Sequence, residues 1–235
     1  MIENSAYNGS SNVQIVFTQD GSNSLYIPEL EEHYHSLHGA LQESNHVFIN
    51  AGLNYLLHQQ KNKCIKILEV GFGTGLNCFL TYLESINRKI MIEYHGIEAF
   101  PVNTGILDSL NYQNIIPSNI ANTSFKDLHD FTWNIVNQVD KDFKLLKKQI
   151  KIQDVILDSD YHLIYFDAFG PKVQSEMWTE TIFNKLYQSL KHDGILVTYC
   201  AKGEIKRILK RVGFSVESIP GPPGKREMTR AVKII

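Results

Sequence analysis

The feature that most constrains the fold is a glycine-rich run of five residues, GFGTG at 71–75. It follows the apolar segment 66–70 (KILEV), which is typical of a buried strand, and it precedes the helix-like segment 76–86. Because glycine lacks a Cβ atom, the backbone can turn sharply in such a run and approach a ligand closely. A strand, a glycine loop and a helix in this order predict an α/β fold that binds its ligand beyond the carboxyl end of the strand.

Apolar and helix-like segments alternate along most of the remaining chain. Further strands are predicted at 90–97, 145–152, 161–166, 194–199, 214–219 and 229–235. Helices are predicted at 104–110, 126–135, 179–190 and 204–212. Such alternation predicts a mostly parallel sheet with helices on both faces, here closed by an antiparallel last strand.

Residues 1–60 are predicted to be an N-terminal extension of the same domain. A hairpin is expected over 13–27, with Asp20-Gly21 in its turn, and a helix from Ala40 to His58. Residues 61–235 then form the main domain. A chain of 235 residues is long enough for one domain with a full hydrophobic core.

Composition and charge favour a cytoplasmic protein without membrane attachment. No apolar run is long enough to cross a bilayer, and the polar N-terminus lacks the features of a signal peptide. Cys64, Cys78 and Cys200 have no metal-ligand spacing and suit a reducing compartment. The formal net charge of −2 argues against binding nucleic acid with the whole surface, although nine of the 23 Lys and Arg residues fall in 202–233.

Acidic residues at strand ends distinguish the glycine loop from a dinucleotide loop. A dinucleotide site usually reads GxGxxG and needs room for a pyrophosphate, whereas this loop reads GxGxG and follows Glu69. A carboxylate there disfavours phosphate and favours the ammonium or sulfonium side of S-adenosyl-L-methionine (SAM). Glu98, at the end of the next strand, is placed to bind two ribose hydroxyls. Asp154, after the third core strand, is placed to accept a hydrogen bond from the adenine amine.

The loop and these acids together predict a SAM site. Asn77, at the start of the following helix, would bond the methionyl carboxylate or else cap that helix. The alternatives are a nicotinamide site, or a tight turn with solvated charges beside it. The predicted cofactor contacts in this part of the chain are Glu69, Gly71, Gly73, Thr74, Gly75, Asn77, Glu98 and Asp154.

Three motifs are more specific than the glycine loop. DAFGP at 167–171 is followed by EMW at 176–178, and GKREM stands at 224–228. Together with segments 32–36 and 43–48, they make the chain resemble the MnmC-like methyltransferases, which complete 5-methylaminomethyl-2-thiouridine in tRNA. The resemblance extends over nearly the whole chain, and it implies a Rossmann-like class I methyltransferase fold that uses SAM.

The resemblance also implies a reaction and its partners. The expected reaction converts 5-aminomethyl-(2-thio)uridine to 5-methylaminomethyl-(2-thio)uridine at the wobble position of a tRNA anticodon stem-loop. The family can carry a flavin oxidase domain, and a stand-alone form is expected here, coupled in function to the enzyme that makes the aminomethyl precursor. The alternative is SAM-dependent methylation of a small-molecule amine. One departure from the family is the stiff Pro222-Pro223 pair before GKREM.

Asp167 is the candidate catalytic residue. It ends the most apolar strand beside the predicted cofactor, where a carboxylate can orient an amine and take its proton. Alternatively, it caps the turn after the strand. Phe169 and Trp178 are candidates to stack on a flipped uracil, although Trp178 can equally be part of the core.

The segment around Tyr34 is predicted to fold over the cofactor. Tyr34 and Ser36 would contact the methionine end of SAM, and His35 the entering amine. The nearby histidines match no zinc spacing, and methyl transfer needs no Lewis acid, so no metal is predicted.

Basic residues near the C-terminal end are candidates for contacts with the tRNA backbone. Lys225 and Arg226 are expected nearest to the active site. The alternative is a solvated charged face. The other members of this predicted strip are Lys202, Lys206, Arg207, Lys210, Arg211 and Arg230.

Overall fold

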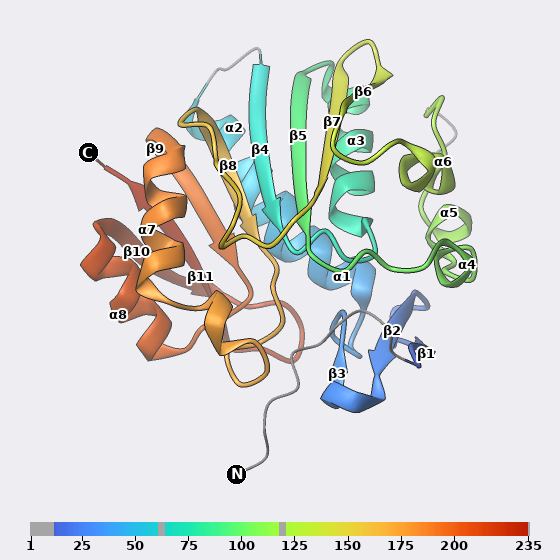
Figure 1. Cartoon of the computed structure of the whole chain (residues 1–235), viewed down its shortest axis with the longest axis horizontal. Coiled ribbons are helices and arrows are strands. Elements are labelled where there is room, and N and C mark those ends of the chain that lie inside the picture. The colour runs from blue at the N-terminus through green and yellow to red at the C-terminus, as the bar shows by residue number, and fades with distance from the viewer. Residues whose placement is uncertain (1–11, 61–63, 118–120, 235) are drawn as a thin grey trace.

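A computed structural model of the protein describes residues 12–60, 64–117 and 121–234, and its centre is an eight-stranded sheet (Figure 1). The strand order is β10-β11-β9-β8-β4-β5-β7-β6. Six strands run in one direction: β4 (Cys64–Val70), β5 (Met91–Glu98), β7 (Phe143–Gln149), β8 (Tyr161–Phe166), β9 (Leu190–Thr198) and β10 (Phe214–Pro220). The predicted mostly parallel α/β fold is therefore confirmed.

Two strands of this sheet are antiparallel. The last strand, β11 (Glu227–Lys233), lies between β9 and β10 and runs against both, as predicted. The second, β6 (Val136–Asp140), forms a hairpin with β7 at the opposite edge. The sequence pattern does not predict β6, and it extends the preceding helix to residue 135. That helix, α6 (Phe125–Asp130), ends earlier because the chain turns through a left-handed Asn134 (φ 64°) into the hairpin.

Helices cover both faces of the sheet, and each face has its own core. Residues of β8 alternate between them, because successive side chains of a strand point to opposite faces: Leu163 and Tyr165 lie in one core, Ile164 and Phe166 in the other. Helices α7 (Glu180–Ser189) and α8 (Gly203–Val212) pack on the second face.

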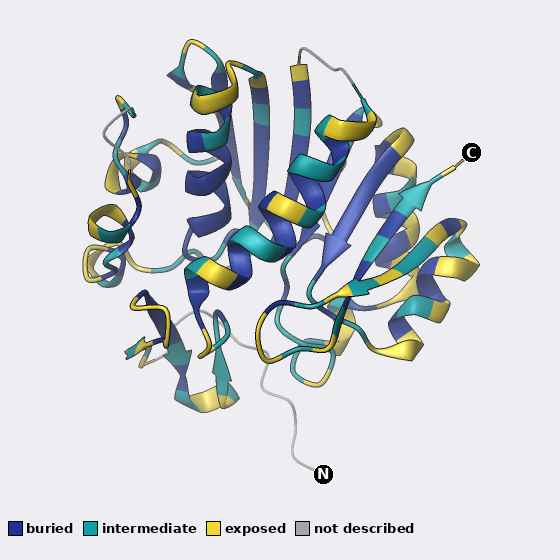
Figure 2. Cartoon of the chain, turned by 180° about the vertical axis from the view of Figure 1, so that it is seen from behind, coloured by how far each residue is buried: buried dark blue, intermediate teal, exposed yellow. Residues whose placement is uncertain are grey.

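The first face is covered by α3 (Leu76–Arg88) and by one long helical segment that Figure 2 shows crossing the sheet. This segment consists of α1 (Ala40–Ser44), a π-helical stretch (Asn45–Asn54) and α2 (Tyr55–Gln59). It matches the helix predicted over 40–58, but the π-helical middle was not predicted. Because it packs against β8 and β9, this part of the N-terminal extension belongs to the core.

The remaining elements lie near the carboxyl ends of the parallel strands (Figure 1). The predicted hairpin forms as β1 (Gln14–Phe17) and β2 (Asn23–Ile27), and the short β3 (Glu32–His33) adds a third strand. Its turn includes Gly21 at φ +84°, as the Asp20-Gly21 pair predicted. Two short helices, α4 (Thr104–Leu107) and α5 (Tyr112–Ile115), precede α6. The polar residues 1–11 lie outside the described residues.

Candidate active site

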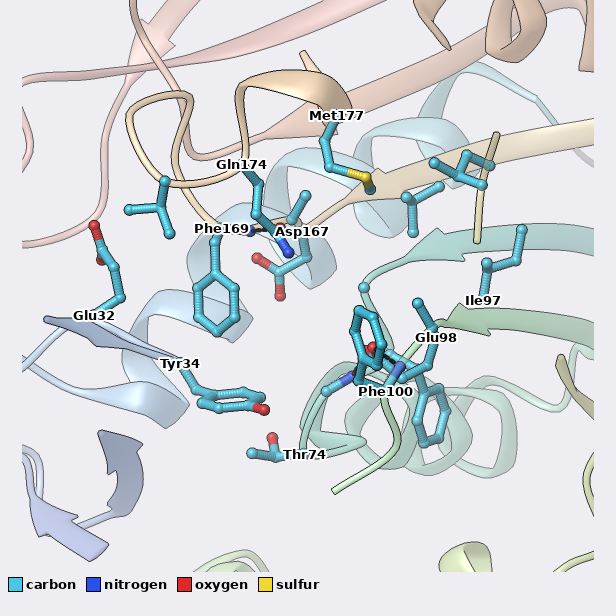
Figure 3. A pocket seen from close by; sticks show the side chains of 18 of the residues that line it. Glu32, Tyr34, Thr74, Ile97, Glu98, Phe100, Asp167, Phe169, Gln174 and Met177 are labelled. Atoms are coloured by element: carbon cyan, nitrogen blue, oxygen red, sulfur yellow. Dashed lines mark hydrogen bonds between the residues drawn. The ribbon is translucent and has the colours of Figure 1, made fainter. Parts of the chain in front are cut away.

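A cavity of about 800 Å³ opens at the carboxyl ends of β4, β5 and β8 (Figure 3). One part is bounded by the glycine loop, the end of β5 and residues 150–154. The other is bounded by residues 30–37, the loop after β8 and three single side chains, Glu43, Tyr199 and Lys225. We call the first part the cofactor arm and the second part the substrate arm.

The glycine loop needs its glycines for close backbone contacts. Gly71 has φ +91°, and a Cβ atom there would lie 2.5 Å from the backbone oxygen of Asp167. Gly71 and Gly73, with Thr74, line the cavity as predicted. Gly75 instead precedes α3 as its N-cap at φ +75° and packs against His129. A Cβ atom at Gly75 would lie 2.9 Å from the His129 ring. Its predicted cofactor contact is therefore replaced by a packing role.

Glu98 holds the loop in place at the floor of the cofactor arm. Its Oε2 accepts the Gly73 N–H at 3.0 Å, and its Oε1 accepts the Phe100 N–H at 3.0 Å. Burial raises the pKa of this carboxyl, while these backbone bonds act in the opposite direction. Each oxygen keeps a second lone pair for a ribose hydroxyl. Asp154 is exposed at the rim of the same arm.

Asn77 connects two carboxyl groups. Its Nδ2 donates to Glu69 Oε1 at 2.8 Å and to Asp167 Oδ2 at 2.9 Å. Both amide hydrogens are used, so Asn77 cannot donate to a methionyl carboxylate as predicted, and it does not cap α3 either. Its buried Oδ1 has no partner among the described residues. Asn77 can therefore accept a hydrogen bond from a ligand ammonium.

Glu69 lies behind the cavity wall rather than in it. The side chain is fully buried and does not line the cavity, in contrast to the predicted direct cofactor contact. Burial raises the pKa of Glu69 well above its usual value, so the prediction of a free anion facing the sulfonium is also corrected. Its effect on a ligand passes through Asn77.

Asp167 stands where the two arms meet. It follows β8 directly, and Figure 3 shows its carboxylate pointing into the cavity. Burial, followed by the charge of Glu43, raises the pKa of Asp167 to about 7. Among the described residues no backbone N–H donates to this carboxylate, and α7 is capped by Thr179, so Asp167 does not act as a cap.

The Tyr34 segment lines the cavity, and its contact with the cofactor stays a prediction. Tyr34 lies edge-on to Phe169, with ring centroids 5.1 Å apart, and both rings line the substrate arm (Figure 3). His35 is buried, with Nδ1 3.0 Å from Ser24 Oγ, and burial lowers its pKa to about 4. His35 is thus neutral at physiological pH. The backbone N–H of Ser36 donates to Glu43 Oε2 at 2.7 Å.

Glu43, Tyr199 and Lys225 complete the substrate arm. Lys225 Nζ lies 2.6 Å from Glu43 Oε1 and 4.0 Å from the centre of the Tyr199 ring. The Tyr199 hydroxyl donates to the backbone oxygen of Ala168 at 2.8 Å. Lys225 was expected near the site, whereas no role was predicted for Glu43 or Tyr199. Glu43 lies in segment 43–48, which carried part of the resemblance, and Tyr199 ends the predicted strand 194–199.

Trp178 does not face the cavity. It is 3% exposed, its Nε1 donates to the Phe169 oxygen at 2.7 Å, and its ring packs edge-on against Phe166 and Phe183. The predicted stacking of Trp178 on a base is therefore wrong, and its core alternative is correct. Of the two candidate rings, Phe169 alone lines the cavity.

The predicted basic strip divides into paired and unpaired cations. Lys206 pairs with Glu227, Arg211 with Glu180, and Arg230 with Glu217, at 2.9, 2.9 and 2.6 Å. In the described part of the chain, no ion pair involves the exposed residues Lys202, Arg207, Lys210 and Arg226. Arg226 does not line the cavity, in contrast to its expected place beside Lys225.

The described residues contain neither a metal-binding cluster nor a membrane-spanning helix. No group of three or more His, Cys, Asp or Glu side chains there is placed to hold a metal ion. No helix within 12–60, 64–117 or 121–234 is long and apolar enough to cross a membrane.

The cofactor arm fits SAM. Gly71 and Gly73 leave room for close approach, Glu98 offers acceptors for a ribose, and the unpartnered Asn77 Oδ1 offers one for an ammonium. A model of the S-adenosyl-L-methionine-dependent methyltransferase family matches residues 125–234. The cavity and this match, which covers somewhat less than half of the chain, both support a SAM-dependent methyltransferase.

The relatives of the chain belong to a narrower group of proteins. It is 28% identical over 92% of its length to the tRNA 5-methylaminomethyl-2-thiouridine biosynthesis bifunctional protein MnmC of Cupriavidus metallidurans, and 28% identical over 88% to that of Magnetococcus marinus. It covers 33% and 32% of these proteins, so it spans about a third of their length. The crystal structure of MnmC2 from Aquifex aeolicus aligns with a TM-score of 0.73 at 25% identity, covering 95% of this chain and 71% of that one. The resemblance found in the motifs is confirmed.

Proposed function

We propose that this methyltransferase acts on the aminomethyl nitrogen of 5-aminomethyl-(2-thio)uridine at the wobble position of tRNA. The observation that carries the proposal is the place of Asp167, whose carboxylate lies between a cofactor arm and a second arm open to an amine. The similarity to MnmC proteins, named for 5-methylaminomethyl-2-thiouridine biosynthesis, supports the choice of substrate.

In this proposal Asp167 is the proton acceptor. A primary amine is largely protonated at neutral pH and cannot attack until it loses a proton. A carboxylate whose pKa is about 7 is well matched to that task, because it is partly ionised yet basic enough to hold the proton. Bound SAM would supply the methyl group from its sulfonium, and Asp167 would hold the nitrogen in line with it.

The cofactor would lie along the glycine loop. Gly71, Gly73 and Thr74 would contact it through the backbone, and Glu98 would accept from the ribose. Asp154 would bond the adenine amine at the rim. Tyr34 and Ser36 would close over the methionine end, where Asn77 accepts from the ammonium.

The uracil ring would enter the substrate arm from the tRNA. Phe169 and Tyr34 offer aromatic faces and edges at this point, and aromatic side chains are the usual contacts for unstacked bases. His35, neutral and fixed by Ser24, would contact the substrate from the same side.

The unpaired cations would hold the tRNA backbone beside this arm. Lys202 and Arg226 lie on neighbouring chain segments, because β9 and β11 pair with Thr198 opposite Thr229. Arg207 extends toward Gly203, next to Lys202. Exposed Lys and Arg residues without protein partners are free to neutralise phosphates of an anticodon stem-loop. We also propose that the enzyme is cytoplasmic and is coupled in function to the enzyme that makes the aminomethyl precursor.

Nucleoside analysis tests this function. The protein is incubated with methyl-labelled SAM and tRNA that carries 5-aminomethyluridine at the wobble position. We expect label in 5-methylaminomethyluridine and none in tRNA with unmodified uridine. Absence of label from the tRNA, together with transfer to amine metabolites, would show a small-molecule methyltransferase instead.

A further inference from the structure

Glu43 joins three separate segments at the inner end of the substrate arm. It lies on α1, is 7% exposed, and lines the cavity. One carboxylate oxygen accepts from the backbone of Ser36, and the other accepts from Lys225. A buried carboxylate with both oxygens bonded is held in one orientation, so Glu43 is a fixed acceptor for cations that reach this end of the cavity.

Lys225 is the cation that this acceptor holds in the structure. Its ammonium group lies over the Tyr199 ring, 4.0 Å from the centroid, while its Nζ donates to Glu43. The Tyr199 ring is fixed by the bond of its hydroxyl to Ala168, next to Asp167. An aromatic face and a carboxylate together form a good site for an ammonium group.

The charge of the whole cavity favours a cationic occupant. An excess of acidic groups in a concave, partly desolvated site attracts cations and disfavours phosphates. The lining therefore suits a base with an ammonium substituent better than it suits the sugar–phosphate backbone. The acidic lining residues are Glu32, Glu43, Glu98, Asp154, Asp167 and Glu176, and the lysines are Lys151 and Lys225.

We propose that Glu43 and Asp167 form a subsite for a primary ammonium group, and that Lys225 occupies Glu43 until the substrate's aminomethyl cation replaces it. This inference rests on the proposed function. The substrate nitrogen donates one hydrogen to Glu43, and a second N–H bond breaks as its proton moves to Asp167. The nitrogen then keeps a lone pair that points to the cofactor arm. Glu43 thereby selects amines over neutral or anionic substituents.

The first test uses Glu43→Gln, which keeps the size of the side chain and an oxygen for the Ser36 N–H. The binding of two tRNAs to the protein is compared: one carries 5-aminomethyluridine and the other carries the neutral 5-hydroxymethyluridine. We expect Glu43→Gln to weaken binding of the aminomethyl tRNA by about tenfold or more, because a charged hydrogen-bond partner is lost. Binding of the hydroxymethyl tRNA should stay nearly unchanged. Glu84→Gln, on α3 and outside the cavity lining, is the matched control.

Equal weakening of both tRNAs would mean that Glu43 only supports the fold, and it would overturn the subsite. SAM binding, measured by calorimetry, shows whether the variant is folded. If the wild-type protein does not methylate the aminomethyl tRNA at all, the proposed function itself fails. The two failures are therefore distinguishable.

The second test uses the opposite charge. Lys225→Met removes the competing cation, so the KM for the aminomethyl tRNA should fall, with Lys141→Met as an exposed control. The acid limb of the pH profile should move to higher pH in Lys225→Met and to lower pH in Glu43→Gln. The other groups that face Asp167 stay in place in both variants: Glu69, Asn77 and Tyr199. A rise of KM in Lys225→Met would contradict the replacement of Lys225 by the substrate ammonium group. Movement of the acid limb in the same direction in both variants would contradict it as well.

Discussion

The walls of the cofactor arm and of the substrate arm differ in how far apart in the sequence their parts lie. Most of the cofactor wall comes from 71–77 and from the end of β5, about twenty residues later. The substrate wall combines residues 30–37, α1, the loop after β8, the end of β9 and the loop before β11. A local wall keeps its geometry through backbone bonds, whereas a dispersed wall depends on side-chain pairs such as Glu43–Lys225.

Asp167, at the junction, should show the largest effect. Asp167→Asn keeps the shape of the side chain but cannot take a proton, and loss of a general base typically lowers kcat by roughly 10²–10⁴-fold. SAM affinity should change little, because the cofactor wall stays intact. Steady-state kinetics with calorimetric SAM binding measures both, and Asp193→Asn is an exposed control. Unchanged turnover would remove Asp167 from the proposed mechanism.

The cofactor wall can be broken at its backbone. Gly71→Ala places a Cβ atom 2.5 Å from the Asp167 oxygen at a φ of +91°. Such strain costs roughly 1–3 kcal/mol, so we expect a lower melting temperature and weaker SAM binding. Gly21→Ala is the matched control, because Gly21 also has a positive φ but has open space around it. If the two variants lose equal SAM affinity, close approach at Gly71 is not what the site requires.

These two walls also differ in how well the sequence predicted them. Gly71, Gly73 and Glu98, predicted as cofactor contacts, do line the cavity, because a strand followed by GxGxG fixes their place through local geometry. Glu69 and Trp178 were misassigned, because the sequence places a residue in a segment beside the cavity without saying which side of the wall its side chain faces. Glu43 was missed because its partners, Ser36 and Lys225, meet it only in the folded chain.

The pH dependence tests the electrostatics of the junction. Asp167 has a pKa raised to about 7, and only its ionised form can accept the proton. We therefore expect kcat/KM to fall about tenfold per pH unit below pH 7. The pKa of this carboxyl in the unfolded chain lies near 3.8, below its value in the folded protein. The folded protein therefore loses stability as the pH rises from about 4 to 7, because the unfolded chain releases this proton first. Asp167→Asn should remove this contribution to the unfolding free energy, and denaturant titrations at pH 5 and pH 8 measure it.

The exposed cations beside the substrate arm should give the smallest effects. Lys202→Ala and Arg226→Ala each remove one charge with no ion-pair partner among the described residues. Each should weaken tRNA binding a few-fold and lower the slope of log affinity against log salt by about 1. Lys206→Ala and Arg211→Ala are controls, since Glu227 and Glu180 already neutralise those charges. Filter binding over a range of salt concentrations separates the two sets. If all four variants change the slope equally, the pairing seen here does not decide which cations meet the phosphates, and the contact with tRNA must be spread over the whole basic strip.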